Sequence, residues 1–146
     1  MNNFAKILLP AVFFVSACGG EKPTEYVFDS QDFEANTENY GNNPFGCLFM
    51  SLIFKKEMMV AVKNSKEPNL DDANNWSPTT VNIFKNKVEW IDLGMETPIN
   101  NGLVTLDFSN VDGAVMNLQV LQEGERLFFG IEDKETKCKM PFKKVG

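Results

Sequence analysis

Hydrophobic and polar residues alternate along much of the second half of the chain. Val104, Leu106 and Phe108 alternate with Thr105 and Asp107, so that one face of the segment is apolar. Such a period of two is typical of strands that are buried on one side only. We expect a strand at residues 103–109. The same alternation predicts three further strands, at residues 114–121, 127–131 and 137–143.

The first half of the chain contains segments that also favour strands. Residues 46–55 (GCLFMSLIFK) are apolar at nearly every position, which is typical of a central strand covered on both faces. Residues 57–63 (EMMVAVK) follow as the next strand after a tight turn. Three shorter strands are expected at residues 24–28, 80–84 and 88–93.

One segment favours a helix. Residues 30–41 (SQDFEANTENYG) begin with a possible cap, carry acidic residues in the early turns and end at a glycine. Phe33, Thr37 and Tyr40 would share one face of this helix. A polar loop is the alternative interpretation. Residues 64–78 are expected to form a polar connection with one helical turn near 70–73, and residues 97–102 a loop.

These elements define the expected fold class. About eight strands joined mostly by short turns, with Asp112-Gly113 as one hairpin turn, predict an all-β, mainly antiparallel domain. We expect a single small β-barrel or β-sandwich with one short N-terminal helix.

The N-terminus has a different pattern. A polar start containing Lys6 precedes the apolar run ILLPAVFFV and two small residues, which is the arrangement of a secretory signal peptide. The run is too short to span a bilayer. Val15-Ser16-Ala17-Cys18 resembles the lipobox of bacterial lipoproteins.

The resemblance to bacterial lipoproteins implies a lipid anchor. A peptidase would remove residues 1–17, the Cys18 sulfur would carry a diacylglycerol, and the new amine would usually be acylated, with palmitate as the expected chain. Because Gly19 stands where an aspartate favours inner-membrane retention in that family, we expect the outer membrane, facing the periplasm. Residues 18–24 would form a short tether and residues 25–146 a single β-rich domain.

Removal of residues 1–17 takes away Lys6 and leaves 13 basic against 20 acidic side chains, a net charge of −7. A negative surface repels phosphate backbones, so nucleic-acid binding is not expected. It suits a cationic partner, although a modest negative charge also simply keeps a domain soluble.

The remaining cysteines, Cys47 and Cys138, are an even pair in a chain expected to be exported, and they predict a disulfide. Two buried free thiols are the alternative. The chain contains no histidine, which excludes Ser-His-Asp and Cys-His catalytic sets and histidine-bound metals. We expect no cofactor, no metal and no enzymatic activity.

The function expected from these features is binding of another envelope protein, in an inhibitor, immunity or assembly-accessory role. A cell-wall enzyme or a toxin would be a suitable cationic partner. Trp76 lies in a polar loop, where it would be either a partner contact or an anchor folded onto the core, whereas Trp90 is expected in the core. The candidate partner-binding residues are Asp32, Glu34, Glu38, Asp71, Asp72 and Trp76.

A second functional hypothesis comes from the ten Phe and six Met that follow residue 17. Such side chains can line a barrel cavity that carries an apolar ligand or lipid, or they can simply fill the core. Phe128 and Phe129 are neighbours on an expected strand and must point to opposite faces. One of the two must therefore be exposed, covered by another layer, or in contact with a partner.

Overall fold

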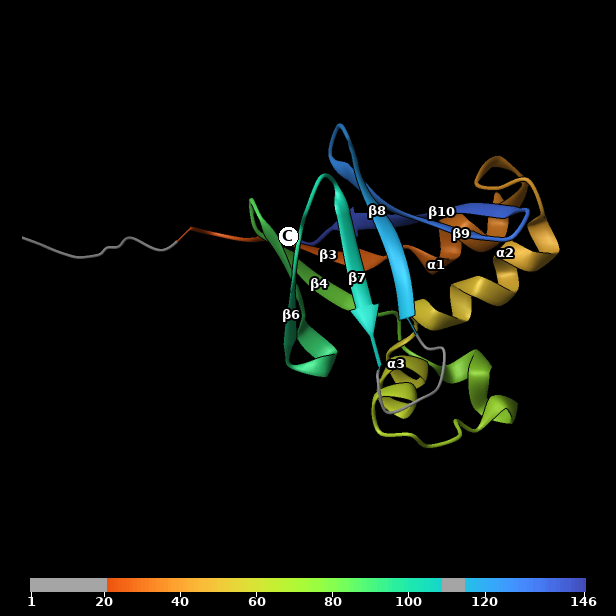
Figure 1. The fold of residues 1–146 in the computed structure, drawn as a ribbon. Coiled ribbons are helices and arrows are strands. Elements are labelled where there is room, and N and C mark those ends of the chain that lie inside the picture. The colour runs from red at the N-terminus through yellow and green to blue at the C-terminus, as the bar shows by residue number, and fades with distance from the viewer. Residues whose placement is uncertain (1–20, 109–114) are drawn as a thin grey trace, which may run out of the picture.

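The structure is a computed structural model that describes residues 21–108 and 115–146. In these ranges, eight strands form one antiparallel sheet in the order β6-β5-β4-β3-β10-β9-β8-β7 (Figure 1). The strands are β3 (Thr24–Phe28), β4 (Thr80–Ile83), β5 (Lys87–Trp90), β6 (Met95–Pro98), β7 (Leu103–Asp107), β8 (Val115–Glu123), β9 (Arg126–Asp133) and β10 (Thr136–Lys144).

The sheet curls until its two ends meet. Strands β6 and β7 stand at opposite ends of the strand order, yet they contact each other, and Asn100 and Leu103 form a bridge in the connection between them. The result is a nearly closed barrel. The predicted all-β, mainly antiparallel fold is confirmed, and the barrel is the architecture that the strands adopt.

The period-two segments form strands because each places one apolar face towards the barrel interior. In β7, Val104 and Leu106 are buried while Leu103, Thr105 and Asp107 are exposed. In β10, Cys138, Met140 and Phe142 are buried and Lys137, Lys139 and Lys143 alternate with them, as predicted. The expected hairpin turn at residues 112–113 lies outside the described residues.

The helices are short. The predicted helix begins where expected, at α1 (Ser30–Ala35), but the cap is Asp29, whose carboxylate accepts a hydrogen bond from the Asp32 amide at 3.2 Å. The α-helix ends before Asn36, and η1 (Thr37–Asn39), a single 3₁₀ turn, continues the segment. The other helical elements are α2 (Pro44–Met50), η2 (Ser51–Phe54), α3 (Lys56–Lys63), η3 (Leu70–Asn75) and η4 (Ile91–Leu93).

The two strands predicted at residues 46–55 and 57–63 are wrong, because these residues form α2, η2 and α3. The Asn43 side chain caps α2 by accepting a hydrogen bond from the Gly46 amide at 3.1 Å, and Pro44 occupies the first turn, where its missing N–H costs nothing. Helical spacing then directs Cys47 and Phe54 into the core.

Smaller differences occur around the hairpins. The helical turn predicted near residues 70–73 is confirmed as η3. Residues 97–98, which were predicted to start a loop at 97–102, instead form the end of β6. This strand pairs along its whole length with β5. The expected strand at 88–93 ends at Trp90, and η4 follows it.

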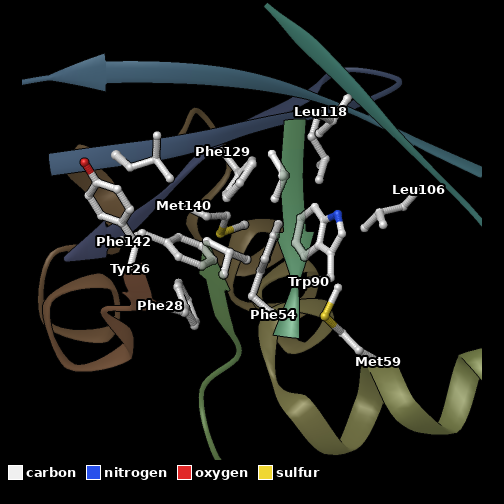
Figure 2. Close-up of a cluster of buried hydrophobic side chains, with 14 of the residues drawn as sticks. Tyr26, Phe28, Phe54, Met59, Trp90, Leu106, Leu118, Phe129, Met140 and Phe142 are labelled. Atoms are coloured by element: carbon white, nitrogen blue, oxygen red, sulfur yellow. The ribbon is translucent and has the colours of Figure 1, made fainter. Parts of the chain in front are cut away.

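Aromatic side chains fill the interior of the barrel (Figure 2). Trp90, Phe129, Phe142 and Phe54 are fully buried, as expected for Trp90. The ring centroids of Trp90 and Phe129 are 5.3 Å apart, and those of Phe129 and Phe142 are 5.0 Å apart. The indole N–H of Trp90 donates to the Thr97 hydroxyl at 2.8 Å, which satisfies its one buried polar atom.

A disulfide joins α2 to the sheet, as predicted. Cys47 bonds to Cys138 of β10, with the two Cα atoms 5.7 Å apart. Gly41 passes directly over this bond, since a Cβ added there would lie 2.2 Å from the Cys47 Sγ. The close approach therefore requires a glycine at this position.

Candidate functional site

Helix α2 has a second apolar face that the core does not cover. Cys47 points into the core, whereas Phe45 and Phe49 are 84% and 76% exposed and Leu48 is 40% exposed. The helix PFGCLFM contains no charged residue. Large apolar side chains exposed in one group commonly mark an interaction surface. We call Phe45, Leu48 and Phe49 the α2 face.

A groove of about 790 Å³ opens beside the α2 face. Its walls are the helical elements on one side and strands β8 and β9 on the other. Three methionines line it, and methionine is a flexible side chain that adapts to different surfaces. The lining residues are Gly46, Phe49, Met50, Leu52, Ile53, Met58, Leu70, Val115, Met116, Asn117, Ile131, Glu132, Asp133 and Thr136. We call this the apolar groove.

The charged residues at the apolar groove are acidic. Glu132 and Asp133 are the two ionisable residues in its lining. Leu70, at another part of the lining, is followed directly by the exposed Asp71 and Asp72. The groove therefore combines an apolar floor with negative charge at its margin.

A second, more polar groove of about 600 Å³ adjoins the first. Amide side chains are prominent in its lining, together with the ring of Tyr40 and the Lys139 side chain. Asn117, Ile131 and Glu132 line both grooves, so the two are neighbours at the same point of the sheet.

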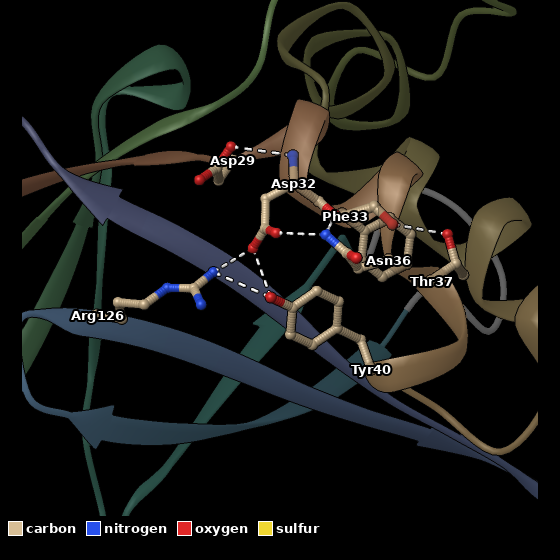
Figure 3. Close-up of polar contacts among 7 residues, drawn as sticks. All are labelled: Asp29, Asp32, Phe33, Asn36, Thr37, Tyr40 and Arg126. Carbon is tan, nitrogen blue, oxygen red and sulfur yellow. Dashed lines mark hydrogen bonds and ion pairs between the residues drawn. The ribbon is translucent and has the colours of Figure 1, made fainter.

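A polar network holds the α1 segment against the outside of the barrel (Figure 3). The Asp32 carboxylate accepts hydrogen bonds from the Tyr40 hydroxyl and from the Asn36 amide, and it pairs with the Arg126 guanidinium. Arg126 also donates to the Tyr40 hydroxyl at 3.2 Å. The network joins α1 and the end of η1 to strand β9.

This network shifts the protonation equilibria of its members. The hydrogen bond from Tyr40, followed by those from Arg126 and Asn36, outweighs desolvation and lowers the pKa of Asp32. Burial, together with the hydrogen bond to Asp32, raises the pKa of Tyr40. Asp32 is thus ionised and already paired within the chain.

The same segment covers Phe128. The Phe128 side chain is 3% exposed, although it points away from the interior that Phe129 fills. The Tyr40 ring centroid lies 5.9 Å from that of Phe128, and the Arg126 and Lys139 cations lie 5.1 Å and 4.4 Å from the ring. Of the three possibilities for Phe128, which were exposure, cover by another layer and contact with a partner, the structure shows cover by another layer of the same chain.

The predicted partner-binding residues fall into separate places. Glu34 and Glu38 are exposed on α1 and η1, and α1 lies against β10. Asp71 and Asp72 are exposed on η3, directly after Leu70, which lines the apolar groove. Asp32 belongs to the network with Arg126.

Trp76 requires a correction. It is 7% exposed, because backbone bonds from Lys56 to Ser77 and from Thr79 to Phe54 hold its loop against the helices. The anchor interpretation is therefore right, and Trp76 offers little surface to a partner.

The sequence analysis missed the α2 face and most of the apolar groove. Interpreting residues 46–55 as a central strand assigned every apolar side chain there to the interior. The signal that identifies the helix is Asn43-Pro44, a capping residue followed by proline at the first helical position.

Comparison of the chain with protein-family models, curated proteins and solved structures found no match. None of the described helices has the length and apolar composition needed to cross a bilayer. Within the described ranges, no three His, Cys, Asp or Glu side chains gather closely enough to hold a metal ion. The candidate site therefore consists of exposed apolar side chains, an open groove and acidic residues at its margin.

Proposed function

We propose that this chain is a non-catalytic, lipid-anchored protein of the bacterial envelope that binds another protein through the α2 face and the apolar groove. The observation that carries the proposal is the exposure of Phe45 and Phe49 on a helix that a disulfide fixes to the barrel. Exposed aromatic side chains on a rigid support bind with little loss of conformational entropy.

The envelope location rests on the N-terminal segment. The lipobox resemblance supports lipidation of Cys18, and a disulfide between Cys47 and Cys138 suits an oxidising compartment. The outer membrane, with the domain facing the periplasm, remains the proposed place. Inhibitor, immunity and assembly-accessory roles all agree with this arrangement.

The orientation of the domain supports a role directed away from the membrane. Figure 1 shows the start of β3 and the C-terminus at one end of the molecule and α2 at the other. The tether before β3 is only about six residues long and reaches about 20 Å. A lipid on Cys18 would thus hold the first end near the bilayer and present the α2 face to the periplasm.

The alternative, a carrier that holds an apolar ligand inside the barrel, has weaker support. Trp90, Phe129 and Phe142 pack against one another in the interior, and both grooves described above are lined by residues at the surface. A ligand inside the barrel would have to displace these rings.

Site-specific photo-cross-linking in the intact envelope tests the proposal. A photoreactive phenylalanine analogue replaces Phe49 in one variant and Val145 in the control, because Val145 is also apolar and 42% exposed but lies at the C-terminal end. We expect a discrete cross-linked species from position 49 and none from position 145. Absence of any cross-link at 49, in cells that express the protein normally, contradicts the proposal.

A further inference from the structure

The strand backbone beside the apolar groove is already paired. Asn117 of β8 and Glu132 of β9 both belong to the groove lining. The ladder pair of Leu118 with Ile131 requires main-chain hydrogen bonding between these two residues, which stand directly beside it. The opposite wall consists of side chains from α2, η2 and α3, together with Leu70 of η3. At this part of the groove, a partner therefore meets side chains and not a free strand edge.

The side chains of the walls are mostly apolar. Met50, Ile53 and Met58 stand on the helical side, and Met116 and Ile131 stand on the sheet side. An extended segment between these walls would bury N–H and C=O groups without partners, which costs free energy. A helix satisfies the same groups within itself. The groove therefore favours a helical occupant, whose apolar side chains stand at positions i, i+3 or i+4, and i+7.

The α2 face continues the apolar groove. Phe49 belongs to both, and Phe45 precedes it by one helical turn on the same face of α2. Both rings are largely exposed in the free protein. A helix that lies in the groove would remove Phe49 from water, which is favourable in free energy. A photoreactive group at position 49 therefore also reports on the occupant of the groove.

Acidic residues stand in two parts of the groove margin. Glu132 and Asp133 lie on the β9 side, and Asp71 and Asp72 lie on η3, next to the groove lining. The sequence of η3, LDDANN, contains no basic residue. Lysine and arginine side chains on the flanks of an apolar helix face would therefore meet carboxylates of opposite charge.

Two lysines of the β9–β10 hairpin offset part of this negative charge. Lys137 pairs with Glu132 at 3.6 Å, but the two side chains are 69% and 60% exposed, so the pair contributes little. Lys134 follows Asp133 in the turn. Neither lysine belongs to the lining of the apolar groove, and the acids of η3 lie in a different element. The margin therefore keeps negative charge that a cationic segment complements.

We propose that the apolar groove binds a cationic amphipathic helix of the partner. The apolar face of that helix lies between the helical wall and β9 and contacts Phe49, and its lysines and arginines lie against the acids of β9 and η3. The three methionines of the lining let the groove adapt to helices of different sequence. This inference rests on the proposed function and specifies the form and charge of the partner segment.

Selection from a display library of random peptides provides the first test. The target is the full mature chain with Cys18→Ser, which needs no detergent, because micelles themselves bind amphipathic helices. We expect enriched peptides to carry apolar residues at helical spacing and an excess of Lys and Arg. Peptides with alternating apolar residues, peptides with an acidic excess, or no enrichment at all would each overturn the inference.

A proline substitution in an enriched peptide distinguishes a helix from an extended segment. The position chosen is a middle one that tolerates alanine without loss of affinity and therefore faces solvent. Proline there should weaken binding by about a hundredfold, because it breaks the helix. The alanine peptide is the matched control. Equal binding of the two peptides would show that the bound segment is not helical.

Two variants of the protein locate the bound peptide. Phe49→Ser should weaken binding by about tenfold, because the ring is buried only in the complex. Val145→Ser, which also removes an exposed apolar side chain, should leave binding unchanged. Equal affinities of all three proteins would mean that the peptides bind elsewhere, and would overturn the assignment of the groove.

Neutral substitutions test the role of the acidic margin. Asp71→Asn/Asp133→Asn removes one exposed acid from each part of the margin and should weaken binding by about fivefold at low salt. Glu34→Gln/Glu38→Gln removes two exposed acids of α1 and η1 and is the matched control. If both double variants bind as tightly as the wild type, charge at the groove does not select the helix.

The outcomes separate this inference from the proposed function. The cross-link from position 49 tests the binding face without reference to the partner's conformation or charge. If that cross-link forms while the peptide experiments fail, only the inference of this subsection is wrong. If the cross-link does not form, the proposed function fails, and the helical partner fails with it.

Discussion

At the scale of single residues, two positions show how local contacts decide what the surface offers. From the sequence, Asp32 is expected to be an exposed acid available to a partner. In the structure, Tyr40, Asn36 and Arg126 already bind its carboxylate. Gly41 is an ordinary glycine in sequence, but the disulfide passes so close that a methyl group would collide with it. Both residues therefore stabilise the frame on which the candidate site is built.

Asp32 should make stability depend on pH in the acid range. Its pKa in the folded chain is lowered from the ordinary value, so the ionised form stabilises the fold. That contribution is fully present above the unfolded pKa, about 3.9, and is lost as the pH falls through the folded value. Asp32→Asn should therefore destabilise the protein at neutral pH and by progressively less in acid, as measured by denaturant unfolding.

The matched control for this pH series is Glu34→Gln, a neutral replacement of an exposed acid on the same helix. It should leave both stability and its pH dependence close to those of the wild type. If the Asp32→Asn difference from the wild type stays constant across the acid range, the ion pair does not contribute in the way described.

Gly41→Ala should destabilise the fold and impair formation of the disulfide. The added Cβ would lie 2.2 Å from the Cys47 Sγ and 2.7 Å from the Lys137 carbonyl oxygen, so α2 or β10 must move. We expect a loss of about 1–3 kcal/mol, the usual cost of overpacking, and a measurable fraction of free thiol. Thiol titration of the purified variant measures that fraction. Gly102→Ala is the comparison for strain without a collision, because its φ is +76° and no atom lies within 4 Å of its added Cβ, so it should destabilise the fold but leave no free thiol.

At the scale of elements, α2 is the helix whose two faces have different surroundings. Cys47 connects one face to the sheet, and the opposite face leaves Phe45 and Phe49 in solvent. Burial of apolar side chains stabilises a fold only where water is excluded. The exposed phenylalanines of α2 therefore contribute little to folding and are available for binding.

This division predicts opposite results for two similar substitutions. Phe54→Ala removes a fully buried ring of η2 and should destabilise the protein by about 3–5 kcal/mol. Phe49→Ala removes a ring that is 76% exposed and should change stability by no more than about 0.5 kcal/mol. Chemical denaturation of both variants checks the prediction, and a large loss with Phe49→Ala would mean that the α2 face is structural.

The elements also show what the sequence can and cannot predict. The strands at residues 103–107 and 136–144 were predictable because each has one apolar and one polar face. Residues 46–63 were assigned wrongly because the periodicity of their apolar side chains fits a buried strand and a helix equally well, and the cap at Asn43-Pro44 is the signal that distinguishes the two for α2. The surface at α2 could not be inferred from apolar residues alone, since burial depends on what packs against them.

At the scale of the whole molecule, the disulfide links distant parts of the chain. It closes a loop with a sequence separation of 91 residues, from α2 to the last strand. In the chain-entropy model, a loop of this length stabilises the fold by about 4–5 kcal/mol. Replacement of both Cys47 and Cys138 by Ala should lower the unfolding free energy by about that amount, as measured in denaturant. Reduction of the wild-type protein should give a similar loss.

The proposed function requires the end where the chain enters the barrel and the end that carries α2 to lie apart. The chain enters the barrel at one end, and helix α2 lies at the other (Figure 1). The apolar groove is lined in part by α2. In the proposed function, a lipid on Cys18 and a bound partner would therefore not compete for the same surface.

The most direct test of the central claim compares partners recovered by the wild type and by the double variant Phe45→Ser/Phe49→Ser. Each protein is purified with associated proteins from mildly solubilised envelope, and the associated proteins are quantified by mass spectrometry. Val145→Ser is the control for loss of an exposed apolar side chain. We predict that a protein enriched with the wild type and with Val145→Ser is lost with the double variant, whose thermal stability is unchanged. Recovery of the same proteins in the same amounts by all three would contradict the assignment of the α2 face as the binding surface.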